Sequence, residues 1–210
     1  MVSTHPFSIR PTTDADWREV RDLRLEMIRD TPTAFAVSLE EALSYDEAEW
    51  RMRGRRGESA HGIAVAAIAE SGRWVGTMAG FLPDQDTGPL LVGVYVAPDF
   101  RGSKSGLTDA LLAAVEDWAC TEGDQLTLHV HEENTRARKA YERRGFVATG
   151  HTVPYNFDSS KNELEMVKNL WKLDTHRFIG VGKADRTRHA LDVRLASGRE
   201  REWKHADWEK

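Results

Sequence analysis

The stretch VAPDFRGSKSGLTDALLAAV, residues 96–115, decides the fold because it joins three different patterns. The residues LLVGVYV (90–96) that lead into it form a short apolar run, which predicts a β-strand. Gly102 and Gly106 mark a loop, and from Leu107 onward the apolar residues recur at helical spacing. The unpaired N–H groups at the start of a helix, together with the helix dipole, favour a bound phosphate. The stretch therefore predicts a strand, loop and helix in an order suited to phosphate binding.

Upstream of this unit, the sequence predicts strands and two helices. Thr13 and Asp16 form a capping-box pattern that opens an amphipathic helix. A second capping pattern predicts a short helix after Ser44 that ends near Gly54, and residues 53–59 are expected to form a mobile loop. Alternating or apolar runs predict strands at residues 7–11, 62–70 and 73–82, of which the last two form an antiparallel hairpin.

Downstream of residue 115, strands and helices continue to alternate. LTLHVH (126–131) predicts a strand, and Asn134 is a good N-cap for a helix that Gly145 is expected to end. Two more strands are predicted at residues 146–153 and 163–170. The expected fold class is α+β, with a mixed central sheet flanked by helices.

Composition limits the classes of protein to be considered. The 210 residues include 40% hydrophobic and 30% charged residues, which suits one globular domain of ordinary size. The net charge is −5 and basic residues are not interleaved with aromatic ones, so no nucleic acid is expected as a partner. The single cysteine, the lack of a long apolar stretch and the polar first residues predict no internal disulfide, no membrane span and a cytoplasmic location.

The C-terminal residues 176–210 differ in charge from residues 1–175, which we expect to form the main domain. Nine lysines and arginines stand against six acidic residues in this extension. ALDVRLASGREREW predicts a β-hairpin, with Leu191, Val193 and Leu195 on one face. A two-stranded hairpin cannot bury such a face alone. The extension is therefore expected to dock on its own chain or on a second subunit of a homodimer; a disordered tail is the alternative.

The order of motifs after the glycine loop resembles that of a known superfamily. The loop and helix are followed by the strand LTLHVHEEN and then by NTRARKAYERRGF, with the residues Asn134, Ala137, Tyr141, Gly145 and Phe146. Over roughly residues 6–173, this arrangement resembles the GNAT superfamily of acyl-CoA-dependent N-acyltransferases. The resemblance implies a GNAT fold, acetyl-CoA as the acyl donor and an amine as the acceptor.

The family's loop pattern is Arg or Gln, two residues, Gly, any residue, and Gly or Ala, and two registers fit it here. Counting from Arg101 puts Lys104 at the required glycine, which is a poor match. Anchoring on the helix puts Gly106 there instead, with two extra residues before Ser105, and we prefer this register because glycine permits a close approach to a phosphate. The resemblance implies cofactor contacts from Val94, Tyr95, Val96, Arg101, Gly102, Ser103, Lys104, Ser105, Gly106, Leu107, Thr108 and Asn134.

Acetyl transfer to an amine needs a base for the amine and an acid for the departing thiolate. Tyr141 stands where the family usually has the tyrosine that protonates the thiolate, and a phenol with a reference pKa near 10 stays protonated at neutral pH. His129 stands five residues before Asn134, where enzymes that acetylate ribosomal-protein N-termini carry a catalytic glutamate. His129 is therefore the candidate base, with a structural or substrate-contacting histidine as the alternative. His129 and His131 lack a third ligand at a characteristic spacing, so no metal is expected.

The predicted function is transfer of the acetyl group of acetyl-CoA to a primary amine by direct attack. A small metabolite and a peptide N-terminus both remain open as acceptors, and the acidic main domain mildly favours a cationic amine. Two alternatives are a non-catalytic acyl-CoA-binding or regulatory module and a fold used mainly for oligomerisation. Trp17, Phe35 and Trp50 are core residues or line the acceptor pocket, which the first two helices commonly shape in this family.

Overall fold

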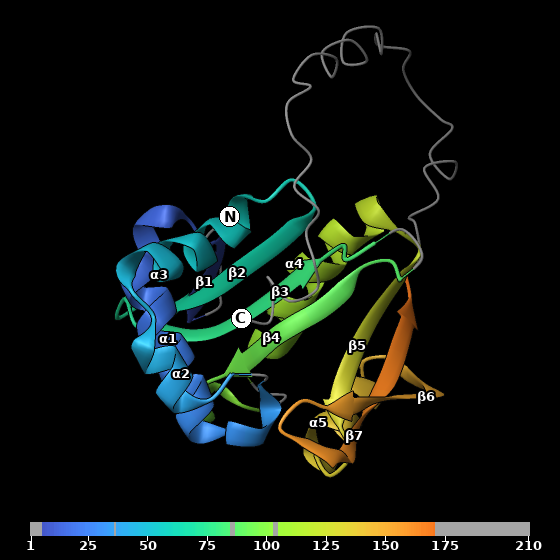
Figure 1. The fold of residues 1–210 in the computed structure, drawn as a ribbon. Helices are drawn as coiled ribbons and strands as arrows, with labels where there is room; N and C mark the ends of the chain where they lie inside the picture. The colour runs from blue at the N-terminus through green and yellow to red at the C-terminus, as the bar shows by residue number, and fades with distance from the viewer. Residues whose placement is uncertain (1–5, 36, 85–86, 103–104, 171–210) are drawn as a thin grey trace, which may run out of the picture.

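A seven-stranded mixed sheet with the order β1-β2-β3-β4-β5-β7-β6 forms the centre of the protein (Figure 1). The computed structural model describes residues 6–35, 37–84, 87–102 and 105–170. All neighbouring strands are antiparallel except β4 and β5, so the sheet is mixed as predicted. The strands are β1 (Phe7–Pro11), β2 (Gly62–Ala69), β3 (Trp74–Phe81), β4 (Leu90–Val96), β5 (Gln125–His131), β6 (Val147–Tyr155) and β7 (Asp158–Asn169).

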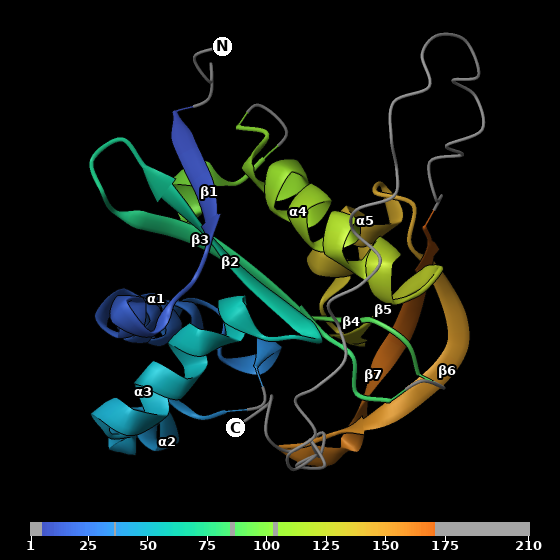
Figure 2. The same cartoon turned by 90° about the horizontal axis from the view of Figure 1, so that it is seen from above.

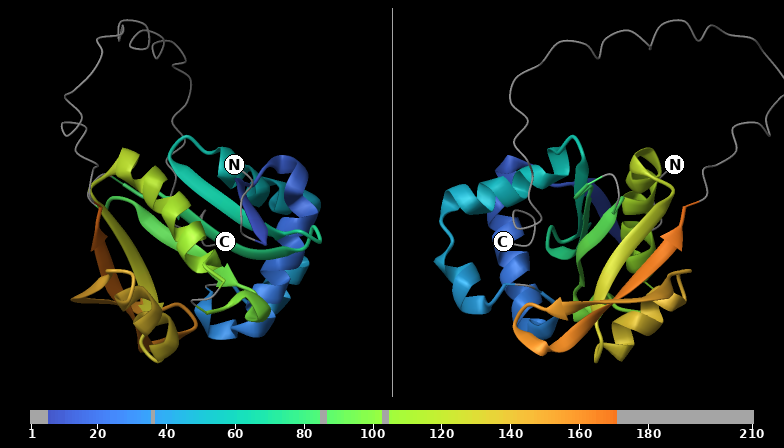
Figure 3. Two further views of the ribbon diagram at one scale, coloured as in Figure 1. Left: turned by 180° about the vertical axis from the view of Figure 1, so that it is seen from behind. Right: turned by 45° about the vertical axis from the view of Figure 1, so that its right-hand side comes forward.

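Helices cover both faces of the sheet, as Figures 2 and 3 show. One face carries α1 (Trp17–Asp30), α2 (Leu39–Ser44) and α3 (Glu47–Gly54), and the other carries α4 (Leu107–Glu122) and α5 (Thr135–Glu142). Short 3-10 turns precede or follow these helices; they are η1 (Asp14–Asp16), η2 (Pro32–Ala34), η3 (Arg55–Glu58) and η4 (Pro98–Phe100). Among the described residues, no helix is both long and apolar enough to cross a membrane.

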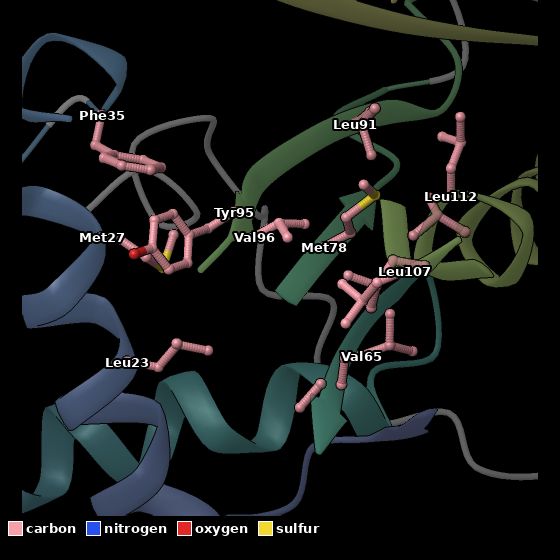
Figure 4. Close-up of a cluster of buried hydrophobic side chains, with 14 of the residues drawn as sticks. Leu23, Met27, Phe35, Val65, Met78, Leu91, Tyr95, Val96, Leu107 and Leu112 are labelled. Carbon is pink, nitrogen blue, oxygen red and sulfur yellow. The ribbon is translucent and has the colours of Figure 1, made fainter. Parts of the chain in front are cut away.

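The hydrophobic core lies on both sides of the sheet (Figure 4). Met27 of α1 and Phe35 lie beside Tyr95 on one side, whereas Leu107 and Leu112 of α4 lie beside Met78 on the other. Each of these side chains is at least nine-tenths buried. The helical periodicity seen from residue 107 therefore places the apolar stripe of α4 on the sheet, as expected.

Two glycines of β3 let α4 lie close to the sheet. A Cβ atom at Gly80 would lie 2.5 Å from Trp118 Cζ3, and one at Gly76 would lie 2.9 Å from a methyl group of Leu107. Both distances are too short for unbonded carbon atoms. The start of α4 is thus held against the centre of the sheet, next to the loop that precedes it.

Two local predictions upstream of β2 are wrong. The cap of α3 is Asp46, whose side chain accepts a hydrogen bond from Glu49 N at 2.9 Å, whereas the Ser44 hydroxyl donates to Glu41 O inside α2. Residues 53–59, expected to be a mobile loop, form the end of α3 and η3, which packs against β2. A Cβ atom at Gly57 would lie 2.2 Å from Thr12 O, so this turn is pressed against the end of β1. The predicted C-terminal hairpin and extension lie outside the described residues.

Strand β4 contains a β-bulge at the centre of the sheet. Thr77 of β3 pairs with Tyr95, whereas Ala79 pairs with Val92, so β4 uses one more residue than β3 over this interval. Gly93 has a φ of +59° there, a conformation that glycine adopts without steric cost. The bulge bends β4 and frees backbone groups of Gly93 and Val94 from regular pairing.

Candidate active site

Strands β4 and β5 diverge, and the divergence opens the main cavity of the candidate site. Their register holds one pair, Leu90 with Thr127, supported by a 2.9 Å hydrogen bond from Thr127 N to Pro89 O. Beyond this point the two strands separate toward their C-terminal ends (Figure 1). A cavity of about 210 Å³ lies between β4, α4 and α5; among its lining residues are Phe35, Met78, Val94, Tyr95, Val96, Arg101, Thr108, Leu112, Asn134, Arg136, Ala137, Tyr141 and Arg144.

The cavity brings together residues that the sequence places in separate segments. Val94, Tyr95 and Val96 come from β4, next to the bulge, and present a strand edge that β5 leaves largely unpaired. Thr108 comes from the first turn of α4, and Asn134 stands at the start of α5. These predicted cofactor contacts therefore share one cavity.

Arg101 fixes the end of β4 to α1. Its Nε donates to Val96 O at 2.7 Å, its guanidinium pairs with Asp30, and the guanidinium lies 5.5 Å from the centre of the Tyr95 ring. The Asp30 pairing lowers the pKa of that carboxyl group. Arg101 thus lines the cavity while its donors hold the loop in place.

The loop before α4 is tied to itself by Ser105. The Ser105 hydroxyl donates to Phe100 O at 2.6 Å and lies 3.1 Å from Gly102 O. Gly106 is the N-cap of α4 with a φ of +66°, and Leu107 is fully buried under the helix. The register anchored on the helix, in which Gly106 is the required glycine, stays a prediction. Ser103 and Lys104, the other two predicted contacts, lie outside the described residues.

Asn134 and Tyr141 come from α5 and face the cavity. Asn134 Oδ1 accepts from Ala137 N at 3.1 Å, so Asn134 is a helix cap as well as a lining residue. The Tyr141 ring meets the Phe146 ring edge-on, 5.6 Å apart. Burial raises the pKa of Tyr141 to about 12, against the opposing effect of the Arg144 charge. The phenol therefore keeps its proton at neutral pH.

His129 does not line this cavity with Tyr141. It lies on β5 opposite Glu165 of β7, and its Nε2 is 3.7 Å from Glu165 Oε2. Thr149 of β6 donates to the other oxygen of Glu165 at 2.8 Å. The three side chains form a polar row across β5, β7 and β6.

Two residues that line the cavity, Arg136 in α5 and Arg144 just after α5, are not among the contacts predicted from the sequence. Arg144 Nε donates to Asp109 Oδ1 at 2.7 Å, which joins the end of α5 to the first turn of α4. The run RARKAYERR predicts a helix, and its positive charges follow Asn134 directly. Positive charges beside a predicted phosphate site were the signal that could have identified them.

Comparisons with known proteins agree with this geometry. The family model of the acetyltransferase (GNAT) family matches residues 21–146, more than half of the chain. A search of curated protein sequences finds no match.

Solved structures share the fold. One is the PaiA N-acetyltransferase from Thermoplasma acidophilum in complex with coenzyme A, with a TM-score of 0.59 and 16% identity over 78% of this chain and 98% of that one. A GNAT-family acetyltransferase from Streptococcus pneumoniae gives a TM-score of 0.65 and 18% identity over 79% and 99% of the two chains. Spermidine N-acetyltransferase from Vibrio cholerae in complex with CoA and spermine gives a TM-score of 0.62 and 17% identity over 79% of this chain and 96% of that one.

The mixed sheet, its divergence at β4 and β5 and the match over residues 21–146 lead to one conclusion. This chain belongs to the acetyltransferase (GNAT) family and is an acyl-CoA-dependent acetyltransferase with acetyl-CoA as its acetyl donor.

Proposed function

We propose that the protein transfers the acetyl group of acetyl-CoA to a primary amine by direct attack, in the cavity between β4, α4 and α5. The observation that carries the proposal is the position of Tyr141 in that cavity, opposite the open edge of β4. An acid and an unpaired strand edge are the two features that a thioester needs beside it. No covalent acyl-enzyme is required.

The donor is held by two parts of the cavity. The pantetheine arm pairs with the backbone of Val94, Tyr95 and Val96 as an added strand would, in the space that β5 leaves open. The phosphates lie at the N-terminus of α4, where Gly106 allows a close approach and backbone N–H groups and the helix dipole favour negative charge. Arg136 and Arg144 supply positive charge on the opposite wall.

The chemical step forms one bond and breaks one. The amine nitrogen attacks the thioester carbonyl carbon, the C–N bond forms, and the C–S bond then breaks. A backbone N–H at the bulge of β4 stabilises the carbonyl oxygen as it gains negative charge. Tyr141 gives its proton to the departing thiolate, and the proton lost by the amine passes through water to His129 beside Glu165.

Measuring free CoA released from acetyl-CoA in the presence of single amines tests the proposal. The panel contains amino acids, their amides, a polyamine and short peptides with free N-termini, because both metabolites and peptide N-termini are open as acceptors. We expect release that depends on the amine and a product one acetyl group heavier by mass spectrometry. Tight binding of acetyl-CoA in calorimetry without release to any amine would instead favour a non-catalytic acyl-CoA-binding module.

A further inference from the structure

Three arginines line a second cavity, on the face of the sheet that carries α1 and α3. The cavity has a volume of about 80 Å³, and its wall includes Arg24 of α1, Arg53 of α3 and Arg56 of η3. This volume exceeds the roughly 10–15 Å³ that one water molecule needs, so a small group fits. Its other walls come from Thr12, Val20, Leu23, Met27, Ala64, Trp74, Thr77, Ala79 and Gly93.

Two arginines of this cavity, Arg24 and Arg53, each have a buried donor without an acceptor among the described residues. Among the described residues that line it, none is acidic. Arg53 has a side chain only 5% exposed and pairs with Glu49 at 3.1 Å, yet its buried Nε has no hydrogen-bond partner within the described part of the chain. The buried Nε of Arg24 likewise has none. Buried donors of charged groups without acceptors are unfavourable, so these two point to an absent acceptor.

The threonines of the wall do not fill that role. Thr12 Oγ1 donates to Gly54 O and Thr77 Oγ1 donates to Val65 O, both at 2.8 Å. Burial, together with the charges of the neighbouring guanidinium groups, lowers the pKa of Arg24 to about 10 and that of Arg56 to about 9. All three groups still carry their charge at neutral pH. The cavity therefore concentrates positive charge in a protein whose net charge is −5.

Aromatic rings hold the guanidinium groups in fixed positions. Arg24 lies 4.7 Å from the centre of the Phe35 ring, and Arg53 lies 4.7 Å from Tyr45 and 5.8 Å from Trp50. A guanidinium group held in this way loses little side-chain entropy when it binds an oxyanion. The guanidinium groups of Arg24 and Arg53 are thus positioned before an oxyanion binds.

The arginine cavity adjoins the cavity of the acetyl donor. Gly93 lines the first and Val94, its neighbour in the bulge of β4, lines the second. Phe35, which stacks on Arg24, also belongs to the wall of the donor cavity. A group held by the arginines thus lies on the other side of the bulge from the donor.

We propose that the acceptor is an anionic amine, whose carboxylate or phosphate group is held by Arg24, Arg53 and Arg56 while its amino group lies at the bulge of β4. This inference rests on the proposed acetyl transfer and names its acceptor class. It reverses the mild preference for a cationic amine that the net charge suggested, because the local charge of a buried cavity outweighs charge spread over a surface.

Matched acceptor pairs test the proposal on the unmodified protein. Alanine is compared with alaninamide, and phosphoethanolamine with ethanolamine, by kcat/KM for CoA release; spermidine is the cationic reference. The two pairs also separate a carboxylate from a phosphate ligand. We expect the anionic member of at least one pair to be favoured by about tenfold or more, because a site built for an oxyanion leaves its donors unpaired with the analogue. Equal rates within both pairs, or a preference for spermidine, would overturn the proposal.

A binding measurement separates this inference from the proposed function. Inorganic phosphate and acetate are titrated in calorimetry and thermal unfolding, without acetyl-CoA. We expect Arg24→Gln and Arg56→Gln to lose anion binding, whereas Arg55→Gln, an equal loss of charge at a neighbouring side chain that is 58% exposed, retains it. Acetyl-CoA affinity measured on each variant reports whether the fold is intact. Anion binding without any acetyl transfer would refute the proposed function alone, and transfer without anion binding would refute the inference alone.

Discussion

Tyr141 is the residue on which the proposed chemistry depends most. It comes from α5, faces the cavity and keeps its proton because burial raises its pKa to about 12. The packing of Tyr141 depends on its ring, which meets the Phe146 ring edge-on, and not on its hydroxyl group. Chemistry and packing can therefore be separated at this position by removing one oxygen atom.

Tyr141→Phe should lower kcat by about tenfold or more, since a positioned general acid contributes at least that much. The affinity for acetyl-CoA should stay the same because the ring is retained. In the unmodified protein, the acid should remain protonated up to about pH 10, because its pKa is raised to about 12. Single-turnover rates across this pH range measure both effects. An unchanged rate in the variant would remove Tyr141 from the mechanism.

His129→Ala should lower kcat/KM and remove the rising limb that a histidine base gives to its pH profile as the imidazole loses its proton. His61→Ala provides the control, because His61 is 72% exposed and lies by Glu122 at the end of α4. The same limb in both variants would assign the pH dependence to water or to the acceptor amine.

Gly106→Glu should weaken acetyl-CoA binding strongly, because a carboxylate at the start of α4 repels the phosphates and a Cβ strains a φ of +66°. Gly72→Glu is the matched control: Gly72 has a φ of +84°, and its added Cβ would meet nothing within 4 Å. Calorimetry with both variants separates the loss of binding from backbone strain. Equal affinities in both would show that the loop register is wrong.

The helices and strands were largely predictable, and the exceptions have physical causes. The outline of β4, α4, β5 and α5 followed from local periodicity and caps, which act over a few residues. Residues 53–59 looked like a solvated loop because of their arginines and glycines, but Arg53 turns inward onto Tyr45 and Trp50. The separation of β4 from β5 does not follow from local patterns, because it depends on pairing between segments about 30 residues apart.

Gly80→Ala should destabilise the packing of α4 on β3 by about 1–3 kcal/mol, because the added methyl group would overlap Trp118. The double variant Gly80→Ala with Trp118→Leu should recover part of this loss, because the smaller side chain leaves room. Chemical unfolding of the single and double variants measures the coupling between the two positions. Strictly additive effects would show that the two side chains do not meet.

The sheet as a whole consists of two parts joined at a narrow place. Strands β1–β4 carry α1–α3, strands β5–β7 carry α5, and the direct pairing between the two sets is the Leu90–Thr127 pair (Figure 1). Helix α4 packs against β2, β3 and β5 and so bridges them. An acetyl-CoA molecule bound in the wedge-shaped space between β4 and β5 would add hydrogen bonds where these two strands share only one residue pair.

Acetyl-CoA should therefore slow amide hydrogen exchange most strongly in the second half of β4 and in the first turn of α4. Protection at β1 and β2, which pair over their whole register, should change little. Exchange followed by mass spectrometry, with and without acetyl-CoA, measures this difference. Uniform protection of every strand would indicate that the donor stabilises the fold globally and does not fill the wedge.

The single residue pair between β4 and β5 also affects how well the protein resists proteolysis. A fold that opens at its weakest strand pair exposes cleavable backbone, and proteolysis follows the population of the open form when opening and closing are fast. A donor that binds only the closed form lowers the open-to-closed ratio by the factor 1 + [L]/Kd, where [L] is the concentration of free acetyl-CoA. We therefore expect acetyl-CoA to slow digestion of the protein by an added protease, with the earliest cuts near the β4–β5 junction.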